Sequence, residues 1–210
     1  KQLFKFVQNT HRYIGANRIE IADWQQVVKV IFKQMLESVE YIHSKKVAHF
    51  DISLENFLIT AVAAKYTTDG SKLEFVLDNR LQCKLCDFGL AARFKNDDFS
   101  SSKRCGKKVF QSPEVASNTN KPFDAKANDI WCLGVCLFMM LVGSMPWSAA
   151  VAKDGCFELV INGKLKQLLA FWKRDHYVTD DMVDLLQGIF QYEPKRMDID
   201  AIKASRWLSN

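Results

Sequence analysis

The sequence lacks several features that mark other classes of protein. It has no long basic run: the net charge is +5, but the lysines and arginines are spread along the chain, which gives little support for nucleic-acid binding and leaves acidic or phosphorylated partners open. The longest apolar run, Ile130 to Val142, is shorter than the roughly 20 residues that cross a membrane, so it predicts a buried helix and no membrane segment. No signal peptide and no internal repeat is visible.

The cysteines also lack a recognisable metal-binding pattern. Cys83 and Cys86 form a lone C-x-x-C, and no second pair of cysteines or histidines stands at a suitable spacing. All six cysteines lie in apolar segments, which is typical of free, buried thiols in a reducing compartment. We therefore expect an intracellular, cytoplasmic protein without a cysteine-bound metal.

The composition that is present is that of one soluble globular domain. The 210 residues are 48% hydrophobic and 25% charged, which is enough to bury a sizeable core. Apolar residues recur at helical spacing over residues 24–44, with Asp23 as the N-cap, and residues 127–142 are apolar nearly all round, as in a helix that runs through a core. Two amphipathic helices are predicted at residues 180–192 and 198–208.

Strands are predicted in only a small part of the chain. Residues 57–60 and 82–86 are short and apolar, which predicts a pair of strands, and residues 72–77 predict another after the turn signal Asp69-Gly70. Residues 94–122 have no clear periodicity and form a long loop, a kind of segment that is usually functional in compact domains. The predicted fold class is therefore mainly α (α+β), a helical bundle with a short strand pair.

Three short motifs carry the residues with a chemical role. Residues 49–56 read HFDISLEN, residues 87–89 read DFG, and residues 112–114 read SPE. Phosphoryl transfer requires a carboxylate beside the attacking hydroxyl and oxygen ligands that hold magnesium on the phosphates. Asp51 and Asn56 can supply one group to the substrate hydroxyl and one to a metal ion. The Asp of the second motif, in a turn after a strand, can supply another metal ligand. Taken singly, each of these residues is more often a cap or turn residue.

In this order the motifs resemble those of the eukaryotic protein kinase family, whose catalytic loop reads H-R-D-x-x-x-x-N and whose metal loop reads D-F-G. The resemblance extends over essentially the whole chain. Residues 87–114 are similar to the family's activation segment, residues 129–134 to its buried central helix, and Arg196 falls where the family places the partner of Glu114. The resemblance implies that residues 1–210 form one domain, the C-terminal lobe of the protein-kinase fold.

The resemblance also implies roles for the residues of the reaction site. Asp51 would be the catalytic base that orients the substrate hydroxyl, and Asn56 and Asp87 would bind Mg²⁺. Glu55 and Leu58 would contribute to ATP binding. Leu58, a core residue with or without a catalytic site, would lie under the adenine.

Five more matching positions would be structural. His49 and Phe88 would pack together and hold the site closed, with Phe88 as a core residue under any interpretation. Glu114 and Arg196 would form a buried ion pair, and Asp129 would anchor the backbone of the catalytic loop.

Two substitutions depart from the family pattern. Phe50 replaces an Arg that usually pairs with a phosphate on the activation segment, so we predict activity without phosphorylation of residues 100–102. Ser53 replaces a Lys that neutralises the transferring phosphate, and Lys107 replaces a Thr that contacts the catalytic Asp in the family. Either Lys107 reaches back to supply the lost charge, with Ser53 leaving it room, or it is a solvated lysine beside Lys108. A Ser paired with Gly-Lys in this way is similar to some divergent protist kinases.

Relative to the family pattern, the chain has one predicted insertion and lacks several motifs. The connection from Asn56 to Asp87 is longer than usual, so residues 61–81 are predicted to be an insertion that projects from the back of the lobe. No G-x-G-x-x-G occurs, and neither does a V-A-I-K strand or the helix that carries its Glu partner. Because Leu3-Phe4 resembles the segment just after the interlobe hinge, we expect that the N-terminal lobe is absent and that this fragment alone has little activity.

The resemblance implies a kinase that transfers the γ-phosphoryl group of ATP to Ser or Thr of protein substrates, with Mg²⁺. Residues 134–147 look closer to the calmodulin-dependent kinase group than to tyrosine kinases. A pseudokinase or scaffold that binds protein partners is the alternative, favoured by Phe50 and Ser53 and opposed by the intact metal ligands. A kinase of small molecules is disfavoured because the family's peptide platform, residues 112–114 and the following helices, is present.

Overall fold

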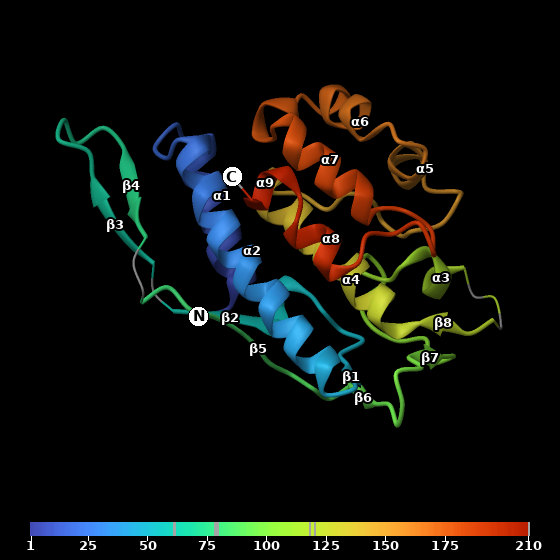
Figure 1. The fold of residues 1–210 in the computed structure, drawn as a ribbon. Coiled ribbons are helices and arrows are strands. Elements are labelled where there is room, and N and C mark those ends of the chain that lie inside the picture. The colour runs from blue at the N-terminus through green and yellow to red at the C-terminus, as the bar shows by residue number, and fades with distance from the viewer. Residues whose placement is uncertain (61, 78–79, 118, 120, 210) are drawn as a thin grey trace.

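Two long helices form the centre of the fold, α2 (Ile21–Ser44) and α4 (Ala125–Val142), and they pack against each other (Figure 1). The computed structural model describes residues 1–60, 62–77, 80–117, 119 and 121–209, and only the backbone of Ala63. The remaining helices surround this pair: α1 (Leu3–Gly15), α3 (Pro113–Ala116), α5 (Gly155–Ile161), α6 (Leu165–Phe171), α7 (Asp180–Ile189), α8 (Ile199–Lys203) and α9 (Arg206–Ser209), with single 3₁₀ turns at Leu54–Asn56 and Asp175–Tyr177.

The helix predicted at residues 24–44 is confirmed, but it begins three residues earlier. Its N-cap is Glu20, so the prediction of Asp23 as the N-cap is wrong. Asp23 lies instead in the first helical turn, where the partial positive charge of the helix N-terminus favours a carboxylate. The inward face follows the predicted apolar spacing, with Val27, Val28, Ile31, Met35 and Val39 each 0% exposed.

The core helix α4 is bounded by residues suited to its ends. The Asp124 carboxylate accepts hydrogen bonds from the backbone N–H groups of Lys126 and Ala127 at 2.7 and 3.4 Å, and Gly143 ends the helix in a left-handed conformation with φ of 78°. By length and composition α4 is apolar enough to cross a membrane, but 89% of it is buried inside the domain. Its apolar character therefore belongs to the core, as the sequence predicts.

Other helices depart from the predictions. The single helix predicted at 198–208 is two helices, because a turn follows α8 and the carbonyl of Ser205 accepts from the N–H groups of Leu208 and Ser209 at 3.1 and 3.0 Å. This turn allows Ile202 on α8 and Trp207 on α9 both to be buried. Sequence reasoning also missed α1, α5 and α6, although α1 buries Leu3, Val7, Thr10 and Ile14 at helical spacing.

The strands occur in antiparallel pairs. β2 (Phe57–Ile59) pairs with β5 (Cys83–Leu85), with Phe57 opposite Leu85, which confirms the predicted pair. The third predicted strand is β4 (Leu73–Val76), and it forms a hairpin with β3 (Ala63–Tyr66). Two shorter pairs join β1 (Val47–Ala48) to β6 (Ala92–Arg93) and β7 (Ser100–Ser101) to β8 (Phe123–Asp124). Residues 61, 78 and 79 of the predicted insertion lie outside the described residues.

The β3–β4 hairpin, within the predicted insertion, packs on the helices at one side of the domain. The N–H of Leu73 donates to the carbonyl of Arg18 at 2.7 Å, and Lys72 forms an ion pair with Glu20. The ring of Phe75 packs against Trp24 at 6.0 Å between centroids. The hairpin thus extends the body of the domain beside α1 and α2 (Figure 1) instead of projecting free of it, because it carries its own apolar and ionic contacts.

Candidate active site

Residues 49–56, which resemble the family's catalytic loop and are called by that name below, are held in place by α4. Asp129 on α4 is 0% exposed, and its two carboxylate oxygens accept from the backbone N–H groups of His49 and Phe50 at 2.8 and 2.9 Å. The ring of His43 lies 3.0 Å from the same carboxylate. Phe50 has a φ of 66°, a left-handed conformation that costs a non-glycine residue energy and persists only where contacts such as these determine it. Asp129 thus stands in the expected anchoring position.

Asn56 joins the two ends of the loop. Its amide nitrogen donates both to the Asp51 carboxylate at 2.8 Å and to the Asp51 backbone carbonyl at 2.7 Å. Both N–H donors of this amide are therefore occupied, and only its oxygen remains to accept or to coordinate. The arrangement fixes the Asp51 carboxylate and leaves an oxygen ligand beside it.

The β2–β5 pair brings the third residue to the same place. Asn56 directly precedes β2, and its carbonyl accepts from the backbone N–H of Cys86, just after β5, at 2.9 Å. Asp87 is the next residue; it is exposed and has a φ of 64°. A carboxylate and an amide oxygen are hard donors of the kind that Mg²⁺ prefers, so the chemistry of Asn56 and Asp87 fits this ion.

Cysteine offers no competing metal site in the described part of the chain. No cluster of three or more His, Cys, Asp or Glu side chains that could hold a metal occurs there. Cys83 and Cys86 are free thiols. Burial, and secondarily the neighbouring Cys86, raises the pKa of Cys83 to about 12, so this thiol stays protonated and is a poor metal ligand at neutral pH.

Lys107 reaches the catalytic loop from the activation segment. Its ammonium group lies 2.8 Å from the Ser53 hydroxyl, 2.8 Å from a Glu55 carboxylate oxygen and 3.8 Å from the Asp51 carboxylate. This geometry agrees with the expectation that Lys107 reaches back, and it differs from that of a lysine in contact only with water. The Glu55 carboxylate, for which a part in ATP binding stays a prediction, pairs with Lys107.

Gly106 permits this close approach. Its φ is +85°, and a Cβ at this position would lie 2.5 Å from the carbonyl oxygen of Phe50. Any side chain here would push the segment away from the catalytic loop, so glycine is required on both conformational and steric grounds. The position of Lys107 therefore depends on its neighbour.

Leu58 and Phe88 are not core residues, and that expectation is wrong. Leu58 is 44% exposed because side chains alternate along β2, where Phe57 and Ile59 face the core. Phe88 is 47% exposed, in the turn after β5, although its ring contacts His49 edge-on at 5.0 Å. His49 itself is fully buried, and its Nε2 lies 3.1 Å from the Cys86 carbonyl.

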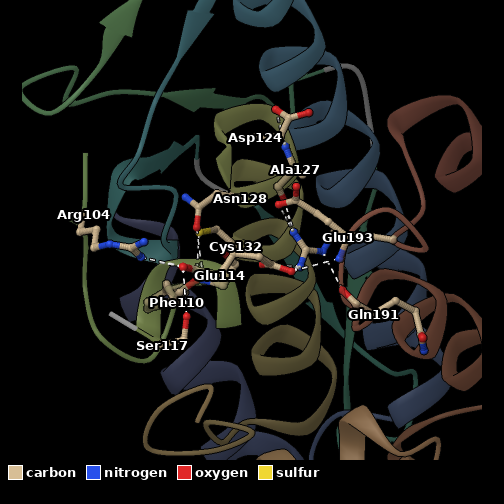
Figure 2. Close-up of polar contacts among 12 residues, drawn as sticks. Arg104, Phe110, Glu114, Ser117, Asp124, Ala127, Asn128, Cys132, Gln191 and Glu193 are labelled. Atoms are coloured by element: carbon tan, nitrogen blue, oxygen red, sulfur yellow. Dashed lines mark hydrogen bonds and ion pairs between the residues drawn. The ribbon is translucent and has the colours of Figure 1, made fainter. Parts of the chain in front are cut away.

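Glu114 and Arg196 form the expected ion pair. One guanidinium nitrogen, Nη2, lies 3.0 and 2.8 Å from the two carboxylate oxygens, and the Arg196 side chain is 2% exposed. Burial raises the pKa of Glu114, but the Arg196 charge and the hydrogen bonds to Arg196 and to the Glu193 backbone outweigh it, and the net pKa is lowered. Figure 2 shows this network, in which the guanidinium also donates to the carbonyls of Ala127 and Gln191 at 2.9 and 3.1 Å.

Sequence reasoning missed an aromatic cluster around Phe50. Its ring lies 6.5 Å from Phe94 and 6.3 Å from Phe123, and Phe94 stacks on Phe99 at 4.8 Å. Phe50, Phe99 and Phe123 are each at most 5% exposed. Two of these rings, Phe94 and Phe99, come from the activation segment, so apolar contacts tie that segment to the catalytic loop. The phenylalanines spaced through this otherwise polar loop could have indicated the cluster from the sequence.

Comparison with known proteins adds an independent result. A family model described as the protein kinase domain matches residues 3–208. The chain is similar to the serine/threonine-protein kinase CHK1 of Mycosarcoma maydis, with 31% identity over 84% of this chain and 23% of the relative. It is 29% identical to testis-specific serine/threonine-protein kinase 2 of Mus musculus, over 88% of this chain and 46% of the relative.

The chain is also 27% identical to the DNA damage response protein kinase DUN1 of Saccharomyces cerevisiae, over 89% of this chain and 35% of the relative. The chain therefore spans less than half the length of each of these curated relatives.

Proposed function

The chain belongs to the protein kinase domain family, and from this premise we propose that the protein containing it transfers the γ-phosphoryl group of ATP to serine or threonine residues of protein substrates. Two of the relatives named above are serine/threonine-protein kinases by name, which supports this residue class. The observation that carries the proposal is the double hydrogen bond from Asn56 to Asp51, in a loop whose end is bonded to Cys86 beside Asp87.

Each of these residues has one task in the proposed mechanism. The Asp51 carboxylate orients the substrate hydroxyl and accepts its proton, and the Asn56 amide prevents that carboxylate from turning away. The Asn56 oxygen and the Asp87 carboxylate would hold Mg²⁺. When bound, the ion neutralises charge on the ATP phosphates.

Lys107 supplies the positive charge that the position of Ser53 lacks. Its ammonium is 3.8 Å from Asp51, so it lies next to the site where the substrate hydroxyl and the transferred phosphoryl group would meet. The contacts of Lys107 with the Ser53 hydroxyl and the Glu55 carboxylate hold the ammonium there before the substrate binds.

The remaining features are part of the same proposal. The exposed face that carries Leu58 and Phe88 would bind one side of ATP. Contacts to the other side would come from an N-terminal lobe outside residues 1–210. An intracellular location is supported by the free state of all six cysteines.

The test uses the full-length protein. Wild-type protein should show Mg²⁺-dependent phosphate transfer to serine or threonine of a protein, and Asp51→Asn should abolish it. Lys107→Met should lower kcat about 10²-fold, by analogy with the loss of one transition-state charge contact. Lys108→Met is the matched control, because Lys108 is the exposed neighbour.

Three results would contradict the proposal. Absence of transfer by the wild-type protein would support the pseudokinase or scaffold alternative. Transfer only to small molecules would assign a different substrate class. Equal kcat values for Lys107→Met and Lys108→Met would remove the role of Lys107.

A further inference from the structure

A pocket beside α3 is built from three separate parts of the chain. It has a volume of about 610 Å³, within the range of roughly 300–1,000 Å³ typical of ligand sites. Its apolar lining comes from α3, from the connection between α4 and α5, from α5 itself and from the segment after α7: Pro113, Ala116, Ala150, Val151, Phe157 and Tyr192. The first residues of its lining follow the segment that carries Lys107, so the pocket and the candidate active site are close in the sequence.

The wall of this pocket is held in place by Arg104. The guanidinium donates to the carbonyl of Glu114 at 2.6 Å (Figure 2). It also donates to the carbonyls of Val115 at 2.8 Å and Lys121 at 3.0 Å. These bonds join α3 to the start of the strand β8, which Lys121 precedes. Arg104 thereby ties together two lining segments of the pocket, the one at Glu114 and the one at Lys121.

The exposed charged side chains that line this pocket are lysines. Lys121 and Lys153 line it and are exposed. The one acidic lining residue, Glu114, is bound by Arg196 and has no free charge to offer. Nearby Asp154 is engaged by backbone N–H groups, since its carboxylate accepts from Ser148, Ala149, Cys156 and Phe157 at 2.8–3.4 Å.

Another acidic side chain near this surface, Glu55 of the catalytic loop, is also paired with a cation. The acidic side chain next to the catalytic residues, Glu55, is neutralised by Lys107 at 2.8 Å. A cationic substrate side chain would have to displace an ammonium that is already held by the Ser53 hydroxyl. The charges that favour an acidic substrate are therefore those at the pocket, Lys121 and Lys153.

We propose that protein substrates dock in the pocket beside α3 through an acidic segment that also carries an apolar side chain. The apolar side chain enters between Ala116 and Val151, and the flanking carboxylates or phosphates meet Lys121 and Lys153. This docking site rests on the proposed kinase function and adds the substrate class to it. Attraction between an acidic segment and the lysine rim weakens as salt screens exposed charges.

The experiment uses two synthetic peptides with the same central serine and one leucine, one flanked by glutamates and the other by lysines. Binding to the full-length protein is measured by fluorescence polarisation, and phosphorylation is measured with KM and kcat separated. We expect tighter binding and a lower KM for the glutamate peptide. The double variant Lys121→Glu/Lys153→Glu should raise that KM about tenfold and leave kcat unchanged, because it reverses two exposed charges.

Two further variants make the test specific to the pocket. Val151→Glu places a charge on the apolar lining and should weaken binding of the glutamate peptide, whereas Lys164→Glu, an exposed lysine that does not line the pocket, should leave it unchanged. Circular dichroism checks that each variant is folded.

The outcomes separate this inference from the proposed function. Equal binding of the two peptides, or a KM for the glutamate peptide that is the same in the wild type and the double variant, would overturn the docking site even if transfer occurs. Self-association of the protein that is lost in Val151→Glu would assign the pocket to a second copy of the chain and also overturn it. Acidic-peptide binding without phosphate transfer would leave the docking site standing and contradict the kinase function.

Discussion

Arg196 offers the most direct test of how the structure is held together. The side chain is 2% exposed and makes an ion pair with both Glu114 oxygens, donates to two backbone carbonyls, and lies with its guanidinium carbon 4.9 Å from the centre of the Trp131 ring. Replacement by methionine keeps much of the apolar stem and removes the charge and every one of these hydrogen bonds. Glu114 then remains in a largely buried position without its cation.

The size of the effect follows from this loss. Removing one partner of a buried ion pair costs about 3–5 kcal/mol, because the other charge is left uncompensated. For a domain of this size each kcal/mol lowers Tm by about 2–4 °C, so Arg196→Met should lower Tm by roughly 6–20 °C. The matched control is Arg206→Met: Arg206 is 72% exposed, and its ion pairs with Asp181 and Asp184 should contribute less than about 1 kcal/mol.

The assay is thermal unfolding followed by circular dichroism at several pH values. Because Arg196 and its hydrogen bonds lower the pKa of Glu114 in the folded state, the pair stabilises the protein above the ordinary pKa of 4.5, and this contribution is lost as the pH falls through the folded value. The difference between wild type and Arg196→Met should therefore be largest near neutral pH and shrink in acid. Equal Tm values for the two arginine variants at pH 7 would refute the reasoning.

Three further predictions follow from the site. Gly106→Ala should lower both activity and Tm, because the added Cβ would lie 2.5 Å from the Phe50 carbonyl oxygen. The control is Gly70→Ala, which reports backbone strain alone, since Gly70 has a φ of +70° and no atom within 4 Å of an added Cβ. Similar losses in both variants would argue against the clash. Phosphatase treatment, or alanine at positions 100–102, should leave the activity of the full-length protein unchanged, since aromatic contacts replace the Arg–phosphate pair; loss of activity on phosphatase treatment would contradict this. The isolated 210-residue chain should show no saturable ATP binding at millimolar ATP by calorimetry, because the face that carries Leu58 is open to solvent; clear saturation would show that this lobe suffices.

The parts of the fold that the sequence predicts are those where neighbours along the chain decide the outcome. The periodicity of α2 and α4 comes from residues three or four apart that face one core, and the β2–β5 pair comes from two short apolar segments. Exposure on β2 was harder to predict, because a short apolar run does not reveal which face is covered. Leu58 therefore looked like a core residue and is instead 44% exposed.

The parts of the site that could not be predicted depend on contacts between distant segments. The pairing of Glu55 with Lys107 joins two parts of the chain through a turn that only Gly106 permits, and sequence spacing alone could not choose this over a solvated lysine. The aromatic cluster likewise joins Phe50 to Phe94 and Phe123 across three segments. Motif resemblance located the individual residues, and only the structure showed which of them touch.

The aromatic cluster around Phe50 has a consequence for how the proposed kinase activity would be regulated. A phosphate held by an arginine has to be added and can be removed, whereas the contacts among these phenylalanines form as the chain folds. Under the proposed function, a catalytic loop arranged in this way would need no covalent on–off step at the usual position. Output would then follow the amount of the protein and its encounter with substrate.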